Sequence, residues 1–248
     1  MEFLNLSSVE LLPNAKASAA FTVDSSKVFK EQQDIPPVVI DEGLSYIPWG
    51  ADNQMPYEIL NLIESDETLS TCQMFNAEVC YGSGLVYNTD KSTTKTREQV
   101  DDFFLENNIA GYYLGVCQDF KHFAFCVSVI ILNADGSKVV RIVRKEACYC
   151  RFTPANKQGK IEKVLYANWR VSIASREDIE VIELLDMASP WTDLQERMQA
   201  KTKTRKFAIV IRVPTPDSTY YPIPYYAALF KGKWYNIKSL IGMAKEAK

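Results

Sequence analysis

The chain has 248 residues, of which 47% are hydrophobic and 24% charged, with a formal net charge of −3. This is the composition of a globular protein, and an aromatic content of 12% excludes a disordered chain. The near-neutral charge excludes a generally basic nucleic-acid-binding protein. The longest apolar run, residues 123–132, is too short to span a membrane as a helix, and the N-terminus lacks a signal-peptide pattern, so we expect synthesis and folding in a cytoplasm.

Charge is distributed unevenly along the chain. Residues 201–248 carry ten Lys and Arg against two acids, which gives this segment +8 and leaves −11 for residues 1–200. The basic segment is either a solvated tail or a surface that faces phosphate or an acidic neighbouring subunit. Both interpretations stay open at this point.

The first half of the chain is predicted to be helical after an irregular N-terminal arm, residues 1–45. A first helix begins at Pro56, because proline is favoured in the first turn. Asp66 caps a second helix, which the sequence Gly82-Ser83-Gly84 stops. The apolar residues that we expect this second helix to turn inward are Leu69, Cys72, Phe75, Val79 and Cys80.

Two further helices complete the helical part, residues 46–123. Thr96 and Gln99 form a plausible capping box for the third helix. This helix is predicted to bury Val100, Phe103 and Phe104. Asn107-Asn108 interrupts the pattern, and a fourth helix is indicated by Tyr113, Val116, Phe120 and Phe123.

Residues 124–213 are predicted to form an antiparallel β part with one short helix. Asp135-Gly136 marks the turn of a first hairpin, because Asp-Gly supplies the positive φ angles that such turns need. A second hairpin follows at 147–152 and 161–171, and further strands at 179–185 and 206–213. The short helix begins at Ser189-Pro190 and is expected to turn inward Trp191, Leu194 and Met198.

Residues 214–248 are predicted to be a Pro/Tyr linker followed by the start of a long amphipathic helix. Residues 214–226 contain four prolines and four tyrosines, which disfavour a strand. The apolar face of the helix is formed by Trp234, Ile237, Leu240, Ile241 and Ala244. Because this helix runs to Lys248 without a cap, we expect the chain to stop inside a longer protein. The predicted fold class is α+β.

Candidate reactive groups are few. His122, the only histidine, and Cys126 are four residues apart, but Cys126 falls in a predicted strand, so the pair should diverge. A small Cys/His hydrolase is therefore the weaker alternative. Cys148 and Cys150 lack the further ligands of a zinc site, and we expect all six cysteines to be reduced, apolar side chains. We predict no enzyme activity, no cofactor and no metal.

Three other features of the sequence carry weaker functional signals. Gly82-Ser83-Gly84 follows a helix, whereas a phosphate-binding loop requires a strand before it and a helix after it. Asp101-Asp102 is expected to lie on a solvated helix face. The tyrosines of residues 220–226 either stack on bases or, more often for such segments, pack against a neighbouring subunit.

Three stretches resemble portal proteins of tailed bacteriophages and related prophages, especially those of anaerobic gut bacteria. Residues 46–87 resemble the family's Ile-Pro-Trp-Gly lead into paired helices that end in a Gly-x-Gly step. Residues 220–248 resemble its Tyr-Pro-x-Pro linker into a long helix, and residues 150–170 its two-stranded excursion. The matching residues are Trp49, Gly50, Asp52, Asn53, Pro56, Gly82, Gly84, Tyr221, Pro222, Pro224 and Trp234.

The resemblance implies a structural ring subunit at the capsid vertex, a dodecamer when full length. Such a ring forms the channel for DNA packaging and ejection. Its partners are the capsid proteins, the large terminase, which docks during packaging, and the head–tail connector proteins, which attach later. It holds double-stranded DNA non-specifically, without a membrane partner, and belongs to the virion after assembly in the host bacterial cytoplasm. Residues 46–123 would be wing- and stem-like and residues 124–213 clip-like. Family members are longer, so the resemblance implies a truncated portal protein. A head–tail adaptor or other minor virion protein is one alternative, and a small Cys/His phage hydrolase is the other.

Overall fold

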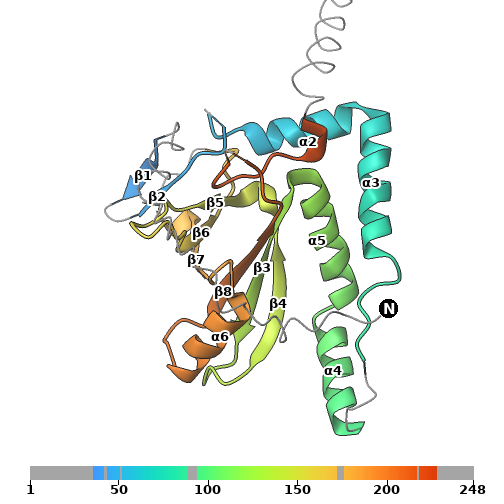
Figure 1. Cartoon of the computed structure of the whole chain (residues 1–248), viewed down its shortest axis with the longest axis vertical. Coiled ribbons are helices and arrows are strands. Elements are labelled where there is room, and N and C mark those ends of the chain that lie inside the picture. The colour runs from blue at the N-terminus through green and yellow to red at the C-terminus, as the bar shows by residue number, and fades with distance from the viewer. Residues whose placement is uncertain are drawn as a thin grey trace, which may run out of the picture.

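The fold is α+β, with five α-helices and eight strands among the described residues. The computed structural model describes residues 36–41, 44–50, 52–88, 94–171, 176–216 and 218–227. Six strands form one sheet in the order β4-β3-β8-β7-β6-β5, and β1 (Val38–Asp41) and β2 (Leu44–Tyr46) form a separate pair. Figure 1 shows α5 beside β3 and β4, with α3 on its outer side. No helix in the described part is long and apolar enough to cross a membrane.

The first two helices lie where the sequence predicts them, with α2 beginning one residue earlier. α2 (Met55–Ser65) has Pro56 in its first turn, and α3 (Glu67–Tyr81) begins after Asp66, whose carboxylate accepts a hydrogen bond from Leu69 N at 2.9 Å. Gly82 ends α3 with φ 55°, a conformation that glycine adopts without strain. The strands β1 and β2 lie partly within the arm that was predicted to be irregular.

The face that α3 buries differs from the prediction. Its buried residues are Leu69, Gln73 and Ala77, which face α2 and α5. Cys72, Phe75, Val79 and Cys80 are exposed instead. The reason is that α3 packs beside α5 through small and polar side chains, so its larger apolar side chains point the other way.

The next two helices are continuous in direction (Figure 1). α4 (Thr94–Glu106) has no buried residue, and Val100, Phe103 and Phe104 are only partly covered, so the prediction that they are buried is wrong. Thr96 lies inside α4 and therefore is not its cap. Asn108 caps α5 (Ile109–Phe123): its side-chain oxygen accepts from Gly111 N at 3.3 Å.

The sheet joins the two predicted hairpins through the last strand. β3 (Phe125–Leu132) pairs antiparallel with β4 (Val139–Lys145), and β5 (Cys150–Phe152) pairs antiparallel with β6 (Lys163–Tyr166). β7 (Glu180–Leu184) pairs antiparallel with β6 but parallel with β8 (Lys206–Arg212). The β part is thus not purely antiparallel, because α6 (Pro190–Gln199) carries the chain across and returns it in the same direction.

Ion pairs tie the two halves of this sheet. The Glu180 carboxylate of β7 forms ion pairs with the ammonium groups of Lys145 of β4, at 2.6 Å, and Lys206 of β8, at 3.0 Å. The Lys145 ammonium also lies 4.2 Å from the Tyr166 ring centroid. Because β4 and β7 are not neighbours in the sheet order, these contacts show that the sheet curls. The main hydrophobic core includes residues from Leu44 to Tyr220, and thus from each of the four predicted parts.

α6 covers a smaller core that contains Leu194, Phe207 and Leu185. Leu194 and Met198 point inward as predicted, but Trp191 is 61% exposed, so that prediction is wrong. Residues 214–226 form no strand where they are described, and Tyr220 returns into the main core. The predicted C-terminal helix, with Trp234, lies outside the described residues.

Candidate functional site: the Arg151 cluster

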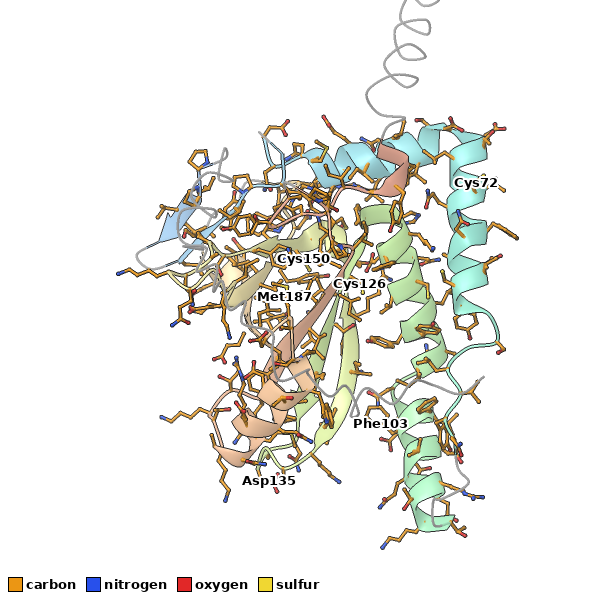
Figure 2. The ribbon with its side chains drawn as sticks, in the orientation of Figure 1. Cys72, Phe103, Cys126, Asp135, Cys150 and Met187 are labelled. Atoms are coloured by element: carbon orange, nitrogen blue, oxygen red, sulfur yellow. The ribbon has the colours of Figure 1, made fainter. Side chains whose placement is uncertain are left out.

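The two resembling stretches at either end of the chain meet around one buried side chain, Arg151 of β5. We define the Arg151 cluster as Trp49, Asn53, Arg151, Trp169 and Tyr221. Figure 2 shows side chains crowded where β5, α2 and the last described residues come together, near the labelled Cys150. Arg151 itself was not singled out from the sequence.

The loop before α2 forms a tight turn that holds Asn53 against Arg151. Trp49 N donates to Asn53 Oδ1 at 3.0 Å, and Met55 N donates to Trp49 O at 3.2 Å. Gly50 has φ 84°, and a Cβ there would lie 2.9 Å from Met55 Cβ, so the tight turn requires glycine. Asp52 is exposed, and its carboxylate accepts from Gln54 N at 3.0 Å, which shapes the same turn.

Arg151 is fully buried, and its guanidinium donates only to uncharged oxygens. Its partners are Asn53 Oδ1, Asn53 O at 3.1 Å, Cys148 O at 2.9 Å and Cys150 O at 2.8 Å. The rings of Trp49 and Trp169 lie 5.7 and 5.4 Å from the guanidinium carbon. Among the described residues no carboxylate forms an ion pair with Arg151. Burial therefore lowers its pKa from the ordinary value, and the aromatic faces and carbonyls compensate the buried charge.

Tyr221 connects the C-terminal stretch to the same cluster. Its ring stacks on Trp49 with centroids 4.7 Å apart and an interplanar angle of 4°. The hydroxyl donates to Ile47 O at 2.6 Å and accepts from Phe152 N at 3.2 Å, while Ile47 N donates to Phe152 O at 2.9 Å. These bonds satisfy backbone groups on the outer edge of β5, which would otherwise stay unpaired. Burial raises the pKa of Tyr221 well above its ordinary value, so the hydroxyl stays protonated.

The other matching residues have separate structural positions. Pro222 and Pro224 are buried directly after Tyr221, and Pro56 is buried in the first turn of α2. Gly82 and Gly84 lie at the far end of α3 with φ 55° and 88°, so the structure does not bring them to the cluster. Trp234 is outside the described residues.

His122 and Cys126 lie on different elements, and both are largely buried. His122 lies in the last turn of α5 and Cys126 in β3, as the sequence predicts. Cys126 is 1% exposed, and burial, with Asp119 nearby, raises the pKa of its thiol to about 12. Burial also lowers the pKa of His122, whose backbone oxygen accepts from the Tyr226 hydroxyl. The pair thus presents a neutral, buried thiol.

The remaining candidates are structural side chains. Cys148 lies in the 3-10 turn Ala147–Tyr149 and not in a strand, and burial raises its pKa to about 11. Within the described ranges no group of three His, Cys, Asp or Glu side chains could hold a metal ion. Asp101 is exposed on α4 and accepts from the Tyr87 hydroxyl at 2.6 Å. Tyr220 is buried and Tyr225 is 86% exposed, so this segment does not present a row of rings to bases.

A buried ion pair on the sheet was also missed from the sequence. Arg144 of β4 donates to both carboxylate oxygens of Asp119 on α5, at 2.7 and 3.1 Å. Burial raises the pKa of Asp119, and the hydrogen bonds from Arg144 oppose this shift. An Asp in the middle of an amphipathic helix carries no distinct sequence signal, so only the fold reveals the pair.

Comparison with known proteins gives no assignment: no protein-family model matches this chain, and no curated protein matches it significantly. The Arg151 cluster joins four parts of the chain: residues 47–53, residues 148–152, Trp169 and residues 220–224. The side chains within it donate, accept and stack, and none of them is an ionised nucleophile.

Proposed function

We propose that the chain is a non-enzymatic structural subunit of a portal-type ring at the capsid vertex of a tailed bacteriophage. The observation that carries the proposal is the stacking of Trp49 on Tyr221 above Arg151. Trp49 and Tyr221 belong to the two stretches that resemble portal proteins, and 172 positions separate them in the sequence. Residues matched on sequence alone thus form one structural unit, as expected if they derive from one family pattern.

The chemistry of the matched residues supports a structural role. Gly50 and Gly82 adopt positive φ, Pro56 starts a helix, and Tyr221 satisfies the edge of β5. A ring subunit needs such rigidity because each copy must hold the same shape to close a cyclic interface. In this proposal residues 46–123 form wing- and stem-like elements and residues 124–213 a clip-like element.

The proposed partners follow from the same resemblance. Copies of the chain close a dodecameric ring in the virion, the large terminase and the head–tail connector proteins dock on it, and double-stranded DNA passes through the channel. Contacts with DNA would be to phosphates and not to base edges, so binding weakens with salt and is independent of sequence.

The decisive experiment uses the protein from the complete reading frame that contains these residues. Its mass in solution is measured by light scattering after size exclusion, and its shape by electron microscopy. We expect a closed ring with an axial channel. A monomer at micromolar concentration contradicts the proposal. A head–tail adaptor is distinguished because it joins particles only after the portal ring is present, whereas the portal ring assembles alone.

A further inference from the structure

The outer face of α3 is apolar although nothing in the described part of the chain covers it. We define this outer face as Cys72, Met74, Phe75 and Val79. Phe75 is 62% exposed, Val79 61% and Met74 58%, and Leu85 and Val86 extend the exposed apolar surface beyond the helix. Figure 1 shows α3 at the margin of the molecule, and Figure 2 labels Cys72 on it.

Apolar side chains therefore lie on both sides of α3. Leu69, Gln73 and Ala77 pack on the inner side against α2 and α5, while the larger apolar side chains point outward. An amphipathic helix normally turns its larger apolar side chains toward a packing partner, and those of α3 point away from α2 and α5. Exposed apolar surface that extends over several neighbouring residues marks an interaction site. We therefore expect the outer face of α3 to bind an apolar protein surface.

The charge around this face restricts what can bind it. Residues 31–90 contain no Lys or Arg, and α2 and α3 with Asp66 between them carry five acids: Glu58, Glu64, Asp66, Glu67 and Glu78. Glu64, Glu67 and Glu78 are exposed. A partner that combines an apolar face with positive charge would therefore match this surface in both respects.

Residues 228–248, which lie outside the described part, have this combination in their sequence. They include the apolar series Trp234, Ile237, Leu240, Ile241 and Ala244, spaced three and four residues apart with one adjacent pair. They also carry five lysines against one acid, Glu246, a net charge of +4. A +4 segment with an apolar series is complementary to an acidic helix with an apolar face.

The chain can reach the face without leaving the molecule. The last described residues, Tyr225–Ala227, are red in Figure 1, and the Tyr226 hydroxyl donates to His122 O in the last turn of α5, the helix that packs against α2 and α3. Six extended residues, 228–233, span up to about 20 Å. This exceeds the length of α2, whose 11 residues rise about 16 Å. The apolar series would then lie along α3, whose 15 residues extend about 22 Å.

We propose that residues 228–248 bind the outer face of α3 in the same chain. The apolar series covers Phe75 and Val79, and the lysines of the segment lie close to Glu64, Glu67 and Glu78. This inference goes beyond the proposed ring function and does not depend on it, since it concerns contacts within one chain.

Cys72 is a natural probe of this contact, because its thiol lies on the covered face. The experiment measures the rate of maleimide reaction at Cys72 in the full chain with Cys80→Ser; the other four cysteines are buried. We expect Ile237→Asp with Ile241→Asp to accelerate the reaction by at least about tenfold, since opening exposes the thiol. The matched control is Asn236→Asp with Ser239→Asp, which adds the same charge outside the apolar series and should leave the rate unchanged.

Two outcomes overturn the proposal. Equal rates in the two variants mean that the segment does not cover α3. Protection that disappears on dilution of the wild-type chain means that a neighbouring copy covers it. Carbodiimide cross-linking of wild-type monomer gives an independent measurement that needs no substitution: lysines of residues 228–248 should link to Glu64, Glu67 or Glu78 in monomeric product. Links from these lysines only to other carboxylates contradict the proposal. A failed ring proposal would alter none of these readouts.

Discussion

Trp49 and Tyr221 stack almost parallel, with ring centroids 4.7 Å apart, and the Tyr221 hydroxyl bonds both Ile47 and Phe152. The Tyr221 side chain therefore links the loop before α2 to the edge of β5, beside the direct bond from Ile47 N to Phe152 O. The stability of the Arg151 cluster can be tested through it.

Replacing Tyr221 with Phe should keep the stacking and remove the hydroxyl. The backbone groups of Ile47 and Phe152 then lose a buried partner, so the free energy of unfolding should fall by about 1–3 kcal/mol. Urea denaturation followed by fluorescence measures this change. Tyr57→Phe is the matched control, because the buried Tyr57 hydroxyl has no hydrogen-bond partner among the described residues. Equal losses in the two variants would show that the Tyr221 hydroxyl bonds contribute nothing specific.

Arg151 should be the most sensitive position of the cluster. Arg151→Met keeps the length of the side chain but leaves Asn53 and the carbonyls of Cys148 and Cys150 without their donors. We expect a loss of at least about 3 kcal/mol, since several buried acceptors lose their bonds together. Arg151→Lys should lose less, because it retains the charge but not the planar set of donors. Arg141→Met, at an exposed position of β4, should change stability by less than about 0.5 kcal/mol.

The ion pairs of Glu180 should make stability depend on acid pH. Burial alone raises the pKa of Glu180, but hydrogen bonds from Lys145 and Lys206 outweigh burial and hold it below the ordinary value of 4.5. The unfolded chain then binds the proton more readily, so this stabilisation is present above pH 4.5 and is lost as pH falls through the lowered pKa. Because Glu180 is one-third exposed, the effect at pH 7 should be at most about 1 kcal/mol.

Glu180→Gln tests this dependence directly. The variant should be less stable than the wild type at pH 7, and the difference should shrink as the pH falls below the usual carboxyl range. Urea denaturation across this pH series gives the difference at each point. Glu98→Gln, at an exposed position on α4, should show no such trend. A difference for Glu180→Gln that is constant with pH would indicate that shape and not charge is responsible.

Cysteine reactivity tests the small-hydrolase alternative. With a pKa of about 12, Cys126 is ionised in roughly one molecule in 10⁵ at pH 7. Cys126 should therefore react with iodoacetamide in the native protein only as fast as the protein opens, whereas exposed Cys80 should react freely. Mass spectrometry of peptides from a labelling time course measures both rates. Fast labelling of Cys126 that His122→Ala abolishes would support the hydrolase instead.

The sequence predicts where helices and strands begin and end better than it predicts which of their faces are buried. Pro56, Asp66 and the Asp135-Gly136 turn act locally, so the ends of α2, the start of α3 and the β3–β4 hairpin lie where they were predicted. The outer face of α3 was misassigned because periodic spacing defines a face but not which side packs on α5. Trp191 of α6 was misassigned for the same reason: the spacing does not show which side of α6 faces the sheet. Leu194 fills the small core there, and Trp191 is left exposed.

The site shows a similar limit. Glycine and proline positions of the matched stretches could be interpreted from local backbone requirements. Arg151 could not, because an arginine that alternates with apolar residues in a strand indicates a solvent-facing position. Its burial depends on Asn53, Trp49 and Trp169, which only the folded chain brings together. The parallel pairing of β7 and β8 was missed because strand patterns do not specify direction.

The position of β8 has a consequence for synthesis on the ribosome. β8 is the last strand of the described residues, yet it lies in the middle of the sheet, between β3 and β7. Until Lys206–Arg212 leaves the exit tunnel, the nascent chain holds the β3–β4 hairpin and the three-stranded unit β5–β6–β7 separately. The native partner of the open β3 and β7 edges has not yet been made. The interval before β8 arrives is therefore the time at which chaperone binding, or premature pairing with another copy, competes with folding.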